Sequence, residues 1–141
     1  MKPLLVLVLL LVLAGCGGGN SRENFVGDAT KICEDATQRI KDLGTPESFT
    51  DTQLYARRAE DAVSDELGSL RELTPPPELE DSFRRYLGTL ERRRRQLELL
   101  AEAADANSMQ AVQEVGSELD VLNARARQDA RAAGIAGCEA G

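Results

Sequence analysis

The sequence predicts an all-α protein, an up-down-up-down four-helix bundle that is held by one disulfide bond. Three observations support this prediction. Apolar residues recur every three or four positions along four stretches of the chain, which is the period of an amphipathic helix. Helix-breaking residues separate these stretches, and the short gaps favour antiparallel neighbours. Two cysteines, Cys33 and Cys138, lie within the first stretch and after the last one.

The first two helices are predicted on either side of Gly44 and Pro46. Gly44 ends the first helix, and Pro46 follows where a helix cannot continue. The second helix is predicted to begin at Thr50, because residues 50–53 (Thr-Asp-Thr-Gln) have the form of a capping box. The first apolar face consists of Phe25, Ala29, Ile32, Ala36, Ile40 and Leu43. The second consists of Tyr55, Ala59, Ala62, Val63, Leu67, Leu70 and Leu73.

Three prolines, residues 75–77, separate the second helix from the third, which is predicted to begin near Pro77 or Glu78. The fourth helix is predicted after Asn107, where residues 107–110 resemble a cap, and Gly134 followed by Ile135 predicts a Schellman ending. The third apolar face consists of Leu79, Phe83, Leu87, Leu90, Leu97 and Leu100 or Ala101. The fourth consists of Met109, Val112, Val115 or Gly116, Leu119, Leu122, Ala126, Ala130 and Ala133.

Residues 1–15 are predicted to be a lipoprotein signal peptide. Lys2 precedes an apolar run over residues 4–13 that would rise only about 15 Å as a helix, too short for a hydrocarbon core of about 30 Å. Residues 13–16 (Leu-Ala-Gly-Cys) then resemble the lipobox of bacterial lipoproteins. The resemblance implies that Cys16 carries lipid and becomes the mature N-terminus on the extracytoplasmic face of the cell membrane. Residues 16–21 would form the lipidated cysteine and a flexible tether, and residues 22–141 the bundle.

With Cys16 assigned to lipid, Cys33 and Cys138 are the two remaining thiols. An even pair outside the cytosol favours a disulfide bond, whereas two free thiols or a metal pair are the alternatives. The chain has no histidine, so a metal site would have to add carboxylates to two sulfurs, and no metal is expected. In an up-down-up-down bundle the start of the first helix and the end of the fourth lie at the same end. The tail after Gly134 could therefore fold back along the first helix and bring Cys138 to Cys33. The predicted topology and the predicted disulfide therefore agree.

Charge and missing residue types exclude several functions. The formal net charge of −7 disfavours nucleic acid and anionic lipid head groups as partners. The absence of histidine removes imidazole-dependent catalysis, haem ligation by imidazole and most catalytic zinc sites. No glycine-rich loop opens a helix after a strand, so a phosphate-binding loop is not expected either. The sequence therefore predicts a protein that is not an enzyme and carries no cofactor.

Four consecutive arginines, residues 92–95, interrupt the apolar face of the third helix. They sweep about 300° of a helix, so Arg93 or Arg94 must face inward and would need a buried carboxylate partner. One interpretation is a solvated or paired surface, and the other is a site for a carboxylate or phosphate ligand. The candidate ligand-binding residues are Arg85, Arg92, Arg93, Arg94, Phe83 and Tyr86.

The layout as a whole resembles small helical lipoproteins of high-GC Gram-positive bacteria. The lipobox, the glycines after it, the helix start around Phe25 and Cys33, the central prolines and the ending around Gly134 and Cys138 carry this resemblance. It implies a membrane-anchored bundle and transfers no functional residue. We expect an interaction or structural module that binds another envelope protein or a wall polymer. The alternative is a helical bundle that binds a small ligand near the arginines of the third helix.

Overall fold

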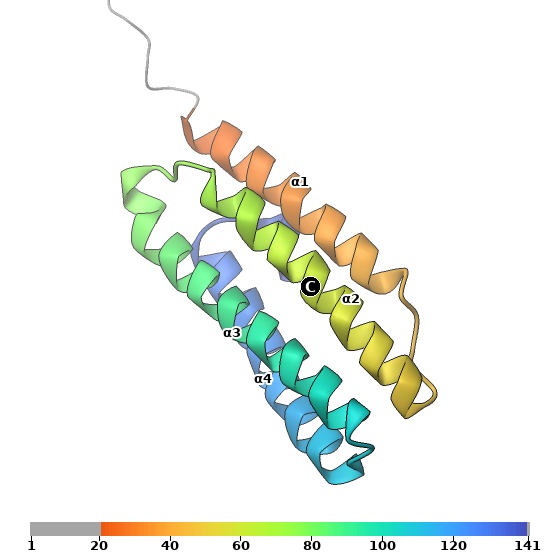
Figure 1. Ribbon diagram of the computed structural model, residues 1–141. Helices are drawn as coiled ribbons and strands as arrows, with labels where there is room; N and C mark the ends of the chain where they lie inside the picture. The colour runs from red at the N-terminus through yellow and green to blue at the C-terminus, as the bar shows by residue number, and fades with distance from the viewer. Residues whose placement is uncertain (1–20, 141) are drawn as a thin grey trace, which may run out of the picture.

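The computed structural model describes residues 21–140 and confirms the predicted all-α bundle (Figure 1). Consecutive helices run up and down, and two short 3-10 turns accompany them. The four helices are α1 (Ser21–Lys41), α2 (Phe49–Arg71), α3 (Glu80–Asp105) and α4 (Met109–Ala132), and the turns are η1 (Pro77–Leu79) and η2 (Ala136–Ala140). The predicted signal peptide, the lipidated Cys16 and most of the tether lie outside the described residues. Within the described part, no helix is long and apolar enough to span a membrane.

The tail after α4 forms part of the helix packing. Each α-helix packs against the next one along the chain, but no Cα atoms of α1 and α4 lie within 8 Å of each other. Instead, η2 packs against both helices and fills the space between them. Figure 1 shows the blue tail turning back from the end of α4 toward α1. The tail therefore closes the bundle, as the predicted return along the first helix requires.

The core combines small side chains with a few large ones. Buried alanines occur in all four helices, and α3 adds the large side chains of Phe83, Tyr86, Leu90 and Leu97. Alanines allow neighbouring backbones to approach, and the larger side chains of α3 fill the remaining volume. Phe83 meets Phe25 of α1 edge to face, with ring centroids 4.9 Å apart. Phe83 and Tyr86, in the first two turns of α3, are thus both core residues.

Two predicted helix starts are displaced. The N-cap of α2 is Ser48, whose Oγ accepts a hydrogen bond from the Asp51 backbone N–H at 3.1 Å, so the helix begins before Thr50. The N-cap of α4 is Ser108, whose Oγ accepts from the Ala111 N–H at 3.3 Å. Asn107 instead adopts a left-handed φ of 52° and closes α3, a conformation that asparagine tolerates.

The end of α4 has the predicted Schellman geometry. Gly134 has φ of 72°, the Ile135 N–H donates to the Ala130 carbonyl at 3.0 Å, and the Gly134 N–H donates to the Arg131 carbonyl at 3.1 Å. The Ile135 side chain is fully buried. This reversal directs the tail back onto α1, where Cys138 lies.

Gly137 marks the closest approach of the tail to α1. A Cβ atom at this position would lie 3.1 Å from the Thr30 Cα and would overlap its Cγ2. We expect Gly137→Ala to lower the free energy of unfolding by about 1–3 kcal/mol, since the tail must move away from α1. Urea unfolding followed by circular dichroism measures this change. The control is Gly68→Ala in α2, where an added Cβ meets nothing within 4 Å. An equal loss of stability in both variants would contradict the prediction.

Candidate functional site

The disulfide lies at the junction of the tail and α1. Cys33 and Cys138 are bonded, with their Cα atoms 4.9 Å apart, and both are buried. The predicted pairing is therefore confirmed. Because Cys138 belongs to η2, the bond fixes the element that separates α1 from α4.

Three buried polar residues surround the disulfide. The Tyr86 hydroxyl donates to Glu66 Oε1 at 3.1 Å, and its oxygen lies 3.4 Å from Cys33 Sγ. Glu66, Tyr86 and Arg93 line a cavity of about 10 Å³ together with both cysteines. That volume is about the size of a single water molecule, so this cavity is too small for an organic ligand. We call Glu66, Tyr86 and Arg93 the polar core.

The polar core contains the inward arginine that the sequence predicts, and the structure identifies it as Arg93. Arg93 is only 9% exposed, and its charge lowers the pKa of Glu66, which is 5% exposed. Burial has the larger effect and raises the pKa of Glu66 to about 7. Burial and the neighbouring Glu66 also raise the pKa of Tyr86, so its hydroxyl remains protonated and donates.

The pKa of Glu66 predicts a pH-dependent stability. Its folded value of about 7 lies above the ordinary 4.5, so between these values the folded state binds more protons than the unfolded state. The stability that Glu66 contributes is complete below about pH 4.5 and is lost as the pH rises through about 7. Between pH 5 and 8 we expect the wild type to lose up to roughly 3 kcal/mol relative to Glu66→Gln, which cannot ionise.

Urea unfolding of both proteins across this pH range measures the effect. Glu34→Gln, which removes an exposed carboxylate from α1, serves as the control and should follow the wild type. Parallel pH profiles for the wild type and Glu66→Gln would show that Glu66 does not titrate in this range.

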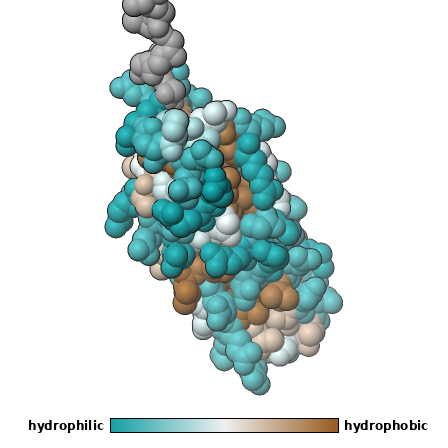
Figure 2. Space-filling view, turned by 90° about the vertical axis from the view of Figure 1, so that its left-hand side faces the viewer, coloured by the Kyte–Doolittle hydropathy of each residue, from teal (hydrophilic) through white to brown (hydrophobic). Residues whose placement is uncertain are grey.

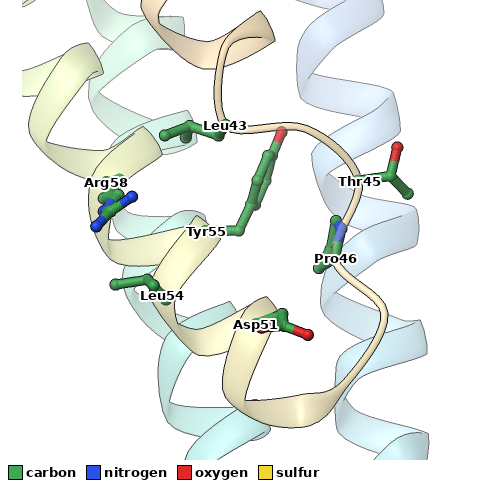
Figure 3. A pocket seen from close by; sticks show the side chains of 7 residues that line it. All are labelled: Leu43, Thr45, Pro46, Asp51, Leu54, Tyr55 and Arg58. Atoms are coloured by element: carbon green, nitrogen blue, oxygen red, sulfur yellow. The ribbon is translucent and has the colours of Figure 1, made fainter.

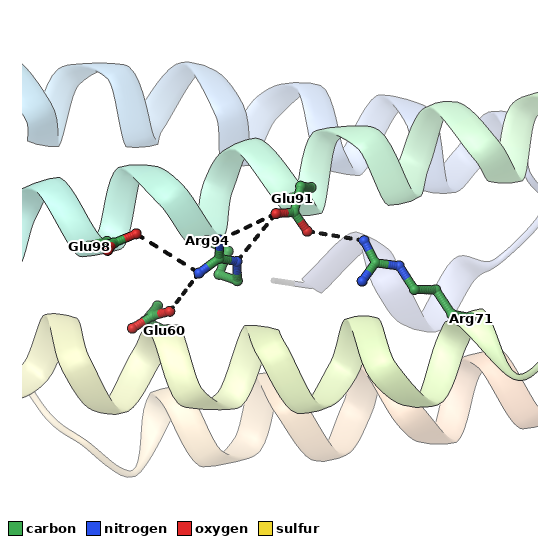
Figure 4. A network of polar contacts seen from close by, with 5 residues as sticks. All are labelled: Glu60, Arg71, Glu91, Arg94 and Glu98. Atoms are coloured by element: carbon green, nitrogen blue, oxygen red, sulfur yellow. Dashed lines mark hydrogen bonds and ion pairs between the residues drawn. The ribbon is translucent and has the colours of Figure 1, made fainter.

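Arg94, the neighbour of Arg93, points to the seam between α2 and α3. It forms ion pairs with Glu60 of α2 at 2.8 Å, with Glu91 at 3.3 Å and with Glu98 at 3.9 Å, and Glu91 also pairs with Arg71 at 3.1 Å (Figure 4). The partly buried Arg94 is therefore committed to holding these two helices together.

The other two arginines of the run, Arg92 and Arg95, open onto a groove between α3 and α4. Its volume is about 580 Å³. The residues that line this arginine groove are Arg92, Arg95 and Gln96 of α3, and Glu118, Val121, Leu122 and Arg125 of α4. Val121 is 63% exposed, although it is a large apolar residue. The groove thus combines three cations and one carboxylate with an apolar wall.

A buried hydrogen bond positions two of the groove arginines. The Thr89 hydroxyl donates to Asp129 Oδ2 at 2.7 Å, and both residues are buried where α3 meets α4. Arg92 Nη2 donates to Thr89 Oγ1 at 3.3 Å, and Arg125 Nε lies 3.6 Å from Asp129 Oδ1. Arg95 has no hydrogen bond or ion pair to any other described residue. One end of the groove therefore carries two positioned guanidinium groups, with a third one free beside them.

Two further hollows flank the loop of residues 42–48, at the opposite end of the bundle from η1. Tyr55 points from α2 toward this loop, with Pro46 and Thr45 on the other side of a space of about 160 Å³ (Figure 3). Pro46 also borders a space of about 340 Å³ that Phe49, Met109 and Val112 line. Figure 2 shows a largely hydrophilic surface whose broader hydrophobic areas lie toward this end.

The structure separates the six candidate ligand-binding residues instead of gathering them. Tyr86 and Arg93 belong to the polar core, Phe83 packs on Phe25, and Arg94 pairs with carboxylates. Only Arg92 lines the arginine groove, while Arg85 is exposed on α3 outside its lining. Val121 and Arg125 were not among the residues predicted from the sequence. Val121 and Arg125 are four residues apart on one face of α4, opposite Arg92 and Arg95. This spacing indicates a shared site only when the pairing of α3 with α4 is known.

No group of three or more acidic or cysteine side chains among the described residues is arranged to hold a metal ion. Comparison of the chain with known protein families, with curated proteins and with solved structures finds no match.

Proposed function

We propose that this protein is a lipid-anchored extracytoplasmic lipoprotein that binds another envelope protein through the arginine groove. It acts without catalysis. The lipobox around Cys16 supports the anchor, and the buried disulfide agrees with an oxidising compartment. The observation that carries the binding role is the exposure of Val121 in a groove that three arginines line together with a single carboxylate, Glu118. The lining carboxylate does not neutralise the three positive charges.

The physical argument for binding rests on what a partner would gain at this groove. Covering Val121 and Leu122 removes apolar surface from water, which favours association. Arg95 is free to pair with a carboxylate of the partner, and Arg92 and Arg125 are already held in place by Thr89 and Asp129. Elsewhere on α3, arginines 84 and 94 pair with carboxylates of this chain, and the exposed Arg85 lies outside the groove. The groove therefore differs in chemistry from the rest of the helix surface.

The small-ligand alternative rests on the size of the same groove. A volume of about 580 Å³ lies within the range of sites for small organic molecules, about 300–1,000 Å³. The arginines would then hold the acidic group of an apolar ligand. Photocrosslinking separates the two candidates, because a protein partner adds the mass of a whole chain.

A photoreactive amino acid placed at Val121 in cells tests the proposed function. The same group at Gln96, on the opposite wall of the groove, should capture the same partner protein, and at the exposed Asp61 of α2 it should not. Arg95→Glu should abolish the adduct at Val121. Adducts that form equally at all three positions, or that survive Arg95→Glu, would overturn the groove as the binding surface.

The anchor has its own test. Intact mass of the protein purified from membranes should match residues 16–141 plus acyl chains, with two thiols that appear only after reduction. Cys16→Ser should remain unprocessed and unlipidated. An unlipidated wild type would overturn the proposed anchor and leave the groove untouched.

A further inference from the structure

Resting on the proposed function, we infer that the arginine groove takes an amphipathic helix of the partner that carries acidic side chains one turn away from an apolar residue on the same face. The occupant is identified by charge, by apolar surface and by the length of the groove. Each of these properties comes from a different set of described residues.

The charge of the groove selects an acidic partner. Arg92, Arg95 and Arg125 face a single lining carboxylate, Glu118, so the groove is positive although the whole chain has a net charge of −7. Asp129 offsets part of this charge from its buried position beside Arg125. Thr89 and Arg125 contact its two oxygens, and the Arg125 side chain remains 57% exposed despite this ion pair. Arginine presents paired N–H donors that match the geometry of a carboxylate.

The apolar part of the groove selects an amphipathic partner rather than a merely acidic one. Val121 is 63% exposed, and Leu122 lines the groove beside it. Leu99, which is 45% exposed, lies four residues after Arg95 on the same face of α3. Val121 is thus the exposed large apolar residue that lines the groove.

The shape of the groove favours a helix as the occupant. Two antiparallel helices form its walls, and residues 118–125 of α4 span about 10 Å, or about two turns. A third helix laid along such a groove presents side chains at positions i, i+3 or i+4, and i+7 on one face. The helix of the partner would place its acidic side chains at the end near Arg92 and Arg125. An apolar side chain one turn further along the same face would then lie over Val121.

A pair of synthetic peptides tests the inference. The first is a helix-stabilised peptide of about four turns, with glutamates one turn away from a leucine on the same face. In the second, lysines replace the glutamates and all other residues are kept. Fluorescence anisotropy with the full chain in detergent should show binding of the acidic peptide at least about tenfold tighter than the basic one. Raising the salt concentration should weaken this binding.

Matched charge reversals on α3 locate the site. Arg95→Glu and Arg85→Glu change the net charge equally, and neither arginine has a hydrogen bond or ion pair to another described residue. Arg95→Glu should weaken the acidic peptide about tenfold or more, and Arg85→Glu by less than about twofold. Val121→Ser should weaken it as well, because the apolar contact is lost. Circular dichroism verifies that each variant is folded.

The outcomes distinguish this inference from the proposed function. Equal affinity for the two peptides, or equal losses from Arg95→Glu and Arg85→Glu, would overturn the acidic helix as the occupant. Crosslinking at Val121 that depends on Arg95 would still support a protein partner in that case. If the acidic peptide binds as expected but no protein is crosslinked in cells, the proposed function is overturned. The preference of the groove for an acidic amphipathic helix would still stand.

Discussion

Replacing Cys33 and Cys138 together by alanine is expected to cause the largest loss of stability of any change considered for this protein. The disulfide joins residues that are 105 positions apart, and the loss of such a cross-link costs about 4–5 kcal/mol in the chain-entropy account. The structure adds a second contribution. Without the bond, η2 is held between α1 and α4 only by its packing, and the polar core beneath it becomes accessible to water.

Thermal and urea unfolding of the double variant measure this loss. The wild type reduced with a thiol reagent is the matched comparison, because reduction removes the cross-link and keeps both side chains. Similar losses in the two proteins would assign the effect to the bond itself. A double variant as stable as the oxidised wild type would contradict the prediction.

Arg93→Ala is expected to have the second largest effect. The substitution leaves Glu66 buried without the positive charge that partly compensates its burial, and an uncompensated buried charge costs up to about 3–5 kcal/mol. Removal of the positive charge also takes the pKa of Glu66 further above its ordinary value. The loss should therefore be greater at pH 8 than at pH 5, where Glu66 is already protonated.

A double-mutant cycle isolates the pair. In the Glu66→Gln background no buried carboxylate is left without its partner, so Arg93→Ala should cost clearly less than it does in the wild type. Arg95→Ala, which removes an exposed arginine two positions away, is the control and should change stability by less than about 0.5 kcal/mol. Equal costs of Arg93→Ala in both backgrounds would show that Arg93 stabilises the fold independently of Glu66.

The fold could be predicted in full outline because local signals repeat over long stretches. Each helix carries its apolar face at the helical period, and the breakers at Gly44, at residues 75–77 and at Gly134 all end helices in the structure. The predicted cap positions were wrong where two suitable residues lie close together. Ser48 and Thr50 both resemble caps, and Asn107 and Ser108 do as well; the backbone conformation decides between them, which composition does not reveal.

The inward position of Arg93 in the polar core follows from a pattern within the sequence. A strict alternation of intervals of three and four on the third helix runs through Phe83, Tyr86, Leu90, Arg93 and Leu97. This register selects Arg93 over Arg94 as the inward residue. The same register on the second helix, Ala59, Val63, Glu66 and Leu70, places a carboxylate on an apolar face. A charged residue at such a position on each of two helices indicates a buried pair.

The arginine groove, by contrast, depends on information that no single helix contains. Val121 and Arg125 are ordinary surface residues on α4 alone, as Arg92 and Arg95 are on α3. They form a site only because α3 packs against α4 in an arrangement that brings these residues together. The relative placement of helices arises from packing along their whole length, and periodicity does not encode it.

The covalent bond between α1 and the tail also determines how the molecule would carry mechanical load. Residues 33–138 form a closed ring that contains α2, α3 and α4, and of the four described α-helices only the part of α1 before Cys33 lies outside it. A pull between the start of α1 and a partner held on α4 enters the ring at Cys33 and divides between two arms. One arm runs through α2 and α3, and the other passes through the disulfide and η2 into the end of α4. Unfolding of the chain from its N-terminal end would stop at Cys33 unless both arms yielded together. The disulfide therefore prevents the helices from being pulled out one after another from this end.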